Sequence, residues 1–150
     1  MTVLEHNLDV ANTKSDSQFP DDFGIVTFGP LAAANVALDT NKVAALMVTD
    51  RDMYIDSVSA RATTDSSANT TFALAYVPSG STPVAANTVT VTGNIDSDMG
   101  DNTTVTAKGL TTAQDANKVP AGSLLVLEGA AAPAAIVNLV LTVRYHTRPC

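Results

Sequence analysis

Alternation of side-chain character over residues 136–146 constrains the fold more than any other feature of the sequence. One set of alternate positions is apolar or aromatic: Val137, Leu139, Leu141, Val143 and Tyr145. The positions between them are mixed: Asn138, Val140, Thr142, Arg144 and His146. Successive side chains of a β-strand point to opposite faces, so this period of two predicts a strand that covers a core with one face. Such strands are typical of antiparallel sheets.

Short segments of similar character fill the rest of the chain. Turn residues separate them, as at Pro78-Ser79-Gly80. Within 53–63 the apolar phase slips at Asp56-Ser57, which predicts a β-bulge. Together the pattern predicts roughly eight to ten short strands and an all-β, antiparallel two-sheet sandwich. The predicted strands are 24–29, 43–48, 53–63, 70–77, 89–92, 103–110, 124–128 and 136–146.

Composition narrows the range of partners. Charged residues make up 15% of the 150 residues, against about 25% in ordinary soluble domains. The formal net charge is −7, and the eight Lys and Arg residues are dispersed along the sequence. Nucleic-acid binding depends on clustered cations, so we expect no nucleic-acid partner. No run approaches the about 20 apolar residues of a membrane span, so we expect no membrane partner.

Residues 1–23 differ from the body, residues 24–150. They are mostly polar and lack sustained periodicity, which predicts an extended N-terminal arm before one sandwich domain. Two interpretations stay open: a frayed terminus, or an arm that becomes ordered by docking on a partner. Isolated apolar residues of the arm would then be its anchors. They are Val3, Leu4, Leu8, Val10 and Phe19.

Three carboxylates lie close together in the predicted acidic loop 95–102. Asp96, Asp98 and Asp101 supply the oxygen ligands that calcium prefers. The spacing does not match an EF-hand loop, because no Glu follows at the twelfth position. A solvated acidic loop is the favoured interpretation, and a weak calcium site is the alternative.

No catalytic motif stands out. The only two histidines, His6 and His146, lie at opposite ends of the chain, and the single cysteine is Cys150. A metal centre usually takes three or four clustered ligands. The chain also lacks a Gly-x-Ser-x-Gly turn and a glycine-rich phosphate loop. We therefore expect no enzymatic activity and no cofactor.

The order of segments over 43–146 resembles that of a known family. It runs through YIDSVSARA at 54–62, FALAYVPSG at 72–80, VPAGSLLVL at 119–127 and VLTVRY at 140–145. This order resembles small jelly-roll proteins encoded among the head genes of tailed bacteriophages, the capsid decoration or cement proteins. The resemblance is one of pattern, without a diagnostic motif.

The resemblance implies a jelly-roll fold and a structural role. Proteins of this family bind the outer surface of the capsid as trimers and stabilise the shell. The expected partners are therefore the major capsid protein and two further copies, and the expected location is the virion's outer surface. The arm anchors Val3, Leu4, Leu8, Val10 and Phe19 would contact the capsid.

The mixed face of the last predicted strand suggests a trimer contact. Val140 and Thr142 on that face are uncharged, which is unusual for a fully solvated surface. They are the predicted contact residues. The main alternative is a jelly-roll module of a head or tail fibre that binds a receptor or glycan. An enzyme such as a cupin ranks last, because two histidines cannot supply its ligand set.

Overall fold

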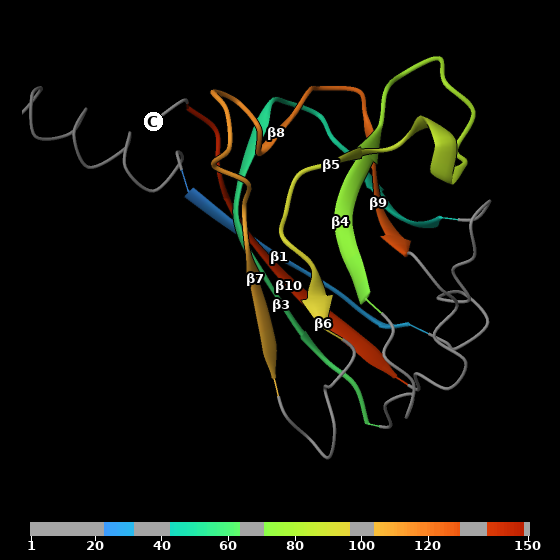
Figure 1. Cartoon of the computed structure of the whole chain (residues 1–150), viewed down its shortest axis with the longest axis vertical. Coiled ribbons are helices and arrows are strands. Elements are labelled where there is room, and N and C mark those ends of the chain that lie inside the picture. The colour runs from blue at the N-terminus through green and yellow to red at the C-terminus, as the bar shows by residue number, and fades with distance from the viewer. Residues whose placement is uncertain (1–22, 32–42, 64–70, 97–103, 130–137, 149–150) are drawn as a thin grey trace, which may run out of the picture.

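The computed structural model describes residues 23–31, 43–63, 71–96, 104–129 and 138–148. Two antiparallel sheets pack face to face, which confirms the predicted all-β sandwich (Figure 1). Sheet A contains β1 (Phe23–Leu31), β3 (Met53–Arg61), β7 (Val105–Lys108), β8 (Lys118–Val119) and β10 (Leu139–His146). Sheet B contains β2 (Ala44–Val48), β4 (Thr71–Val77), β5 (Val89–Thr90), β6 (Ile95–Asp96) and β9 (Leu124–Gly129).

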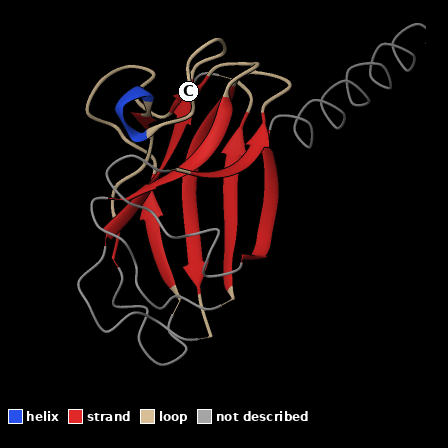
Figure 2. Cartoon of the chain, turned by 90° about the vertical axis from the view of Figure 1, so that its right-hand side faces the viewer, coloured by secondary structure: helices blue, strands red, loops and turns tan. Residues whose placement is uncertain are grey.

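The order of strands is that of a jelly roll. In sheet A the order is β1-β10-β3-β7, and in sheet B it is β2-β9-β4-β5. Both β5 and β6 pair with β4, and both β7 and β8 pair with β3, so each couple acts as one interrupted strand. Counted this way, the described residues form eight strands, and the first of them, β1, lies beside the last, β10. Figure 2 shows the long strands side by side. Two sheets of this kind are the jelly-roll arrangement.

The core lies between the inner faces of the two sheets. Leu139, Leu141 and Val143 of β10 are fully buried, which confirms the apolar face predicted from their alternation. From the facing sheet, inner side chains of β4 and β9 pack into the same cluster. They include Phe72, Leu74, Leu125 and Leu127.

A β-bulge interrupts the pairing of β3 with β10, as the sequence predicted. Arg144 lies opposite Ser57 and Tyr145 opposite Ile55, so Asp56 is the extra residue. The Gly109 N–H donates to the Asp56 carbonyl at 2.9 Å. A Cβ on Gly109 would lie 1.9 Å from the Ile55 carbonyl oxygen, so only glycine allows this close approach. The bulge is thus held by Gly109, the residue that follows β7.

Residues 91–93 cross from sheet B to sheet A and close one side of the sandwich. The Val91 N–H donates to the Leu74 carbonyl at 2.9 Å, and the Leu74 N–H donates to Thr92 Oγ1 at 3.0 Å. Then the Gly93 N–H donates to the Lys108 carbonyl at 2.9 Å. The hydroxyl of Thr92 therefore replaces a main-chain partner where the strand leaves β4.

Two short strands lie where the sequence predicted none. Ile95–Asp96, predicted as the start of the acidic loop, forms β6, and Lys118–Val119, which none of the predicted strands includes, forms β8. Ile95 and Val119 are both fully buried, so each short strand anchors one apolar side chain in the core. Within the described ranges, no helix has the length and apolar character needed to cross a bilayer.

Candidate interaction face

The outer face of sheet A is the side of β1, β10, β3 and β7 that points away from the core. Register aligns its side chains in cross-strand rows, because directly paired residues of an antiparallel sheet share a face. One row runs Ile25, Arg144, Ser57, Lys108. The next row runs Thr27, Thr142, Ser59, Thr106.

Hydroxyl groups occupy the middle of this face. Ser59 Oγ and Thr106 Oγ1 lie 2.9 Å apart and share a hydrogen bond, with Thr27 and Thr142 in the same row. Thr27 and Thr106 are exposed. The row is therefore polar, uncharged and accessible, which suits hydrogen bonding to a partner surface.

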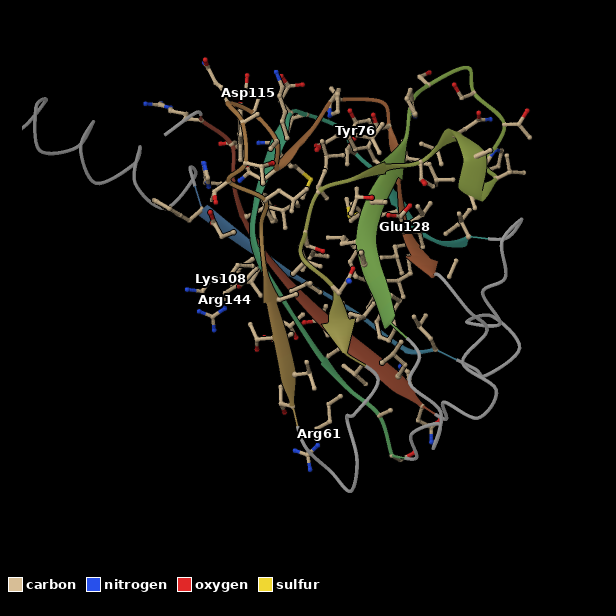
Figure 3. All side chains as sticks on the ribbon, viewed as in Figure 1. Arg61, Tyr76, Lys108, Asp115, Glu128 and Arg144 are labelled. Atoms are coloured by element: carbon tan, nitrogen blue, oxygen red, sulfur yellow. The ribbon has the colours of Figure 1, made fainter. Side chains whose placement is uncertain are left out.

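Three cations stand out from the same face. Arg61, Lys108 and Arg144 are all exposed. Figure 3 shows Lys108 and Arg144 extending from the same side of the sheet, with Arg61 toward its far end. Within the described part of the chain, none of the three forms an ion pair with a carboxylate. These cations are far apart in the sequence. They lie on the same face because β3, β7 and β10 are neighbours in the sheet.

Cations near the β2–β3 turn are paired instead. Lys118 Nζ lies 2.9 Å from Asp52 Oδ2, and Arg51 lies 3.2 Å from Asp50. The Lys118 ammonium beside Asp52 holds the pKa of that carboxyl below its usual value, and the Ala121 N–H adds a hydrogen bond. Hydrogen bonding from Arg51 likewise lowers the pKa of Asp50. Unpaired cations are therefore a feature of the outer face of sheet A.

Apolar side chains flank the polar rows. Phe23 and Ile25 at the start of β1 are each 64% exposed, and Val140 at the start of β10 is 36% exposed. Val48 and Val89 of sheet B are exposed as well, but only on sheet A do two such side chains, Phe23 and Ile25, lie on neighbouring outward positions of one strand, an arrangement typical of interaction surfaces.

Two shallow pockets place an arginine beside these apolar groups. A pocket of about 540 Å³ is lined by Phe23, Ile25 and Arg144, together with Gly24, Asp56 and Tyr145. A second pocket of about 420 Å³ contains Arg61 and Val140. Each end of the face therefore offers an apolar contact next to a guanidinium.

One corner of the face is held by His146. Its Nδ1 lies 2.7 Å from Asp56 Oδ1, and its ring stacks on Tyr54 with the centroids 5.2 Å apart. Phe23 packs against the same imidazole at 6.1 Å. The bulge that sets Asp56 out of register aims its carboxylate at His146. These contacts secure the start of β1 to β3 and β10.

The outer face of sheet B is different. Ala75, Val77 and Val126 there form a small second core and are at most 2% exposed. The Glu128 carboxylate accepts hydrogen bonds from the hydroxyls of Thr88 and Thr90. Around β4 and β9 this face is therefore occupied by the chain's own contacts, although Val48 at the end of β2 is 65% exposed. The outer face of sheet A combines exposed apolar side chains with cations and is the candidate for partners.

The sequence and the structure were compared with those of known proteins. No protein-family model and no curated protein matches the sequence. In structure, the chain is similar to one from the acidic stable capsid structure of Helicobacter pylori bacteriophage KHP30. The two share 15% sequence identity with a TM-score of 0.42, over 83% of this chain and 85% of that chain.

Residues predicted as sites fall into three groups. Val140 and Thr142 lie on the outer face of sheet A, Val140 exposed and Thr142 partly buried, so the predicted contact pair does share an accessible face. Asp96 ends β6, while Asp98 and Asp101 lie outside the described residues. The arm anchors also lie outside them: Val3, Leu4, Leu8, Val10 and Phe19. Their capsid contact and the calcium site stay predictions.

Sequence reasoning missed the three cations and the apolar pair Phe23 and Ile25. Phe23 had been assigned to the arm, yet it is the first residue of β1. Phe23 and Ile25 are alternate residues, so the period of two of a β-strand places both side chains on the same face. This spacing could have predicted them as a pair. Among the described residues, no group of three or more His, Cys, Asp or Glu side chains is placed to hold a metal ion.

Proposed function

We propose that this chain is a structural protein of a bacteriophage virion. It binds the outer surface of the major capsid shell as a homotrimer, stabilises that shell as a decoration or cement protein, and has no catalytic activity. The observation that carries the proposal is the outer face of sheet A, where exposed apolar, hydroxyl and cationic side chains lie together.

The composition of this face suits a protein partner. Phe23 and Ile25 provide apolar area of the kind that dominates binding energy in interfaces. Cations around them fix orientation and raise the rate of encounter with an acidic surface. Repetition of such contacts over a lattice of capsid subunits multiplies the effective affinity of each trimer.

The jelly-roll order supports the same role. A sandwich with buried cores on both sides of sheet B provides a rigid body that adds little flexibility to a shell. The family resemblance of the segments 54–62, 72–80, 119–127 and 140–145 points to decoration proteins within this fold. Fold alone does not determine function, so the interaction face carries the argument.

Co-sedimentation with capsids tests the proposal. Purified full-length protein is mixed with shells that lack it, and binding and the shells' heat resistance are measured. We expect saturable binding and a raised temperature of shell disruption. Absence of both would contradict the proposal.

A matched pair of variants locates the contact. Ile25 on β1 and Val48 on β2 are 64% and 65% exposed, but they belong to different sheets. We expect Ile25→Asp to weaken assembly of the trimer, and with it binding to shells, and Val48→Asp to leave both unchanged. Equal effects of both variants would remove the outer face of sheet A from the proposal.

The second candidate is a receptor- or glycan-binding module, favoured by the pocket of about 540 Å³. Phe23 and Tyr145 line it beside the charged groups of Asp56 and Arg144. Apolar walls with a few polar groups are typical of small-ligand sites. A glycan array followed by calorimetry would support this candidate if hits appear and are lost in Arg144→Ala.

A further inference from the structure

We infer that the outer face of sheet A receives residues 1–22 of a neighbouring copy of this chain. The inference rests on the homotrimer part of the proposed function. It assigns the arm to a neighbouring copy, where the family resemblance assigned it to the capsid.

Charge complementarity is the first argument. Residues 1–22 carry five carboxylates and one lysine, a formal net charge of −4. The outer face of sheet A carries Arg61, Lys108 and Arg144, and the two carboxylates beside them already have partners: Asp56 is hydrogen-bonded to His146, and Asp52, at the edge of the face, is paired with Lys118. An acidic segment and a basic face with unpaired cations are an attractive combination at short range.

The order of residues in the arm provides a second argument. Its apolar anchors are followed closely by carboxylates: Leu4 by Glu5, Leu8 by Asp9, and Phe19 by Asp21. The face repeats the complementary pairing in its two pockets, with Arg144 beside Phe23 and Ile25, and Arg61 beside Val140. The arm thus offers three apolar-acidic couples, and two of them can occupy the two apolar-basic pockets.

Length is the third argument. An extended segment of 22 residues reaches about 70 Å. A strand of nine residues such as β1 is only about 30 Å long. The arm joins the body at Phe23, at the corner of the face, so it can leave its own sandwich and still cover the face of the next.

Symmetry favours a neighbouring copy as the source of the arm. Two outer faces of sheet A packed against each other would bring their cations together, which is repulsive. Arm-to-face contact joins two different surfaces, and such heterologous contacts close into rings when the rotation allows. Each copy has one arm and one face, so a closed trimer satisfies every arm.

Zero-length crosslinking tests the contact directly. A carbodiimide activates a carboxylate, the Lys108 amine attacks the activated carbonyl, an amide forms, and the activator leaves as its urea with the carboxylate oxygen. Full-length isotope-labelled and unlabelled copies are mixed at high salt and returned to low salt before coupling. We expect crosslinked peptides that join Lys108 of one isotope to Glu5, Asp9 or Asp16 of the other.

The chain contains its own control for this experiment. Lys118 Nζ lies 2.9 Å from Asp52 Oδ2 of the same chain, so their crosslink contains one isotope only. Lys108–arm crosslinks of a single isotope would mean that the arm covers its own face, and they would overturn the inference. A trimer that yields the Lys118–Asp52 product but no Lys108–arm product would overturn it as well.

Charge reversal provides an independent readout. Arg144→Glu and Arg51→Glu change the net charge equally, but Arg51 pairs with Asp50 away from this face. We expect Arg144→Glu to lose the trimer at concentrations where the Arg51→Glu variant retains it, as measured by sedimentation. A trimer retained in Arg144→Glu, with loss of shell binding only, would assign the face to the capsid and overturn the inference. A monomeric parent chain would instead contradict the proposed trimer.

Discussion

The two outer faces of the sandwich differ although both are built by the same alternation. On sheet B the outward positions Ala75, Val77 and Val126 are buried, and Glu128 is hydrogen-bonded to two threonine hydroxyls. On sheet A the outward positions hold exposed cations, hydroxyls and apolar groups (Figure 3). The face of sheet B around β4 and β9 is covered by contacts within the chain, whereas the face of sheet A leaves cations and apolar groups exposed.

Because of this difference, we expect one face to determine the stability of the fold and the other to determine association with partners. Substitutions on the outer face of sheet B should change the free energy of unfolding, because they disturb buried groups. Substitutions on the outer face of sheet A should leave unfolding nearly unchanged and alter assembly. Four predictions test the separation, beginning with the largest expected effect.

The largest effect is expected for a charge placed in the second core. Val126→Asp buries an unpaired carboxylate and should cost about 3–5 kcal/mol of unfolding free energy. Val140→Asp, at an exposed position of the other sheet, should stay within about 0.5 kcal/mol of the parent. Urea denaturation of both variants measures the difference. Equal losses would show that the two faces do not differ in this way.

Glu128 gives the next largest effect. Its carboxylate accepts two hydroxyl hydrogen bonds, and bonds to a charged group contribute about 1.5–3 kcal/mol each. Glu128→Ala should therefore lower the unfolding free energy by about 2 kcal/mol or more. Glu128→Gln keeps the size and one acceptor oxygen, so its loss should be smaller. The prediction fails if thermal denaturation ranks the two variants in the opposite order.

Val140 tests the face of sheet A through assembly. Val140→Lys removes the exposed apolar side chain beside Arg61, so an apolar anchor of the arm loses its contact, and the protein should shift from trimer to monomer with little change in unfolding. Val48→Lys, on β2 of the other sheet, is the matched control and should remain trimeric. Light scattering gives both masses. A trimeric Val140→Lys variant would exclude Val140 from the contact.

The smallest effect is expected for the ion pair of Lys118 with Asp52, at the edge of the outer face of sheet A. Lys118 lowers the pKa of Asp52 from 3.8, so the stability from this pair is fully present above about pH 3.8 and is lost as pH falls through the lowered pKa. An NMR titration should place Asp52 below 3.8, and Lys118→Met should return it toward that value. If the pKa of Asp52 is the same in the variant as in the parent, Lys118 does not stabilise the Asp52 carboxylate.

Much of the fold was predictable because alternation reports burial directly. Leu139, Leu141 and Val143 show their burial in the sequence, and the phase slip at Asp56-Ser57 locates the bulge. Two short strands escaped prediction, because Ile95 and Val119 are single buried residues without a repeating pattern around them. Their pairing is decided by β4 and β3.

The interaction face could be predicted only in part. Val140 and Thr142 were identified from the uncharged side of one strand, which local pattern reveals. Arg61, Lys108 and Arg144 belong to three strands distant in sequence, and only the sheet order β10-β3-β7 makes them neighbours. Pairing between strands distant in the chain leaves no local pattern, so basic residues that are dispersed in the sequence can still share one face of a sheet.

Sedimentation of the full-length chain, alone and with capsid shells that lack it, tests the central claim most directly. The account predicts a trimer in solution that moves into the shell fraction. A stable monomer that stays in the supernatant across the concentration range would contradict both the association through the outer face of sheet A and the structural role proposed for the protein.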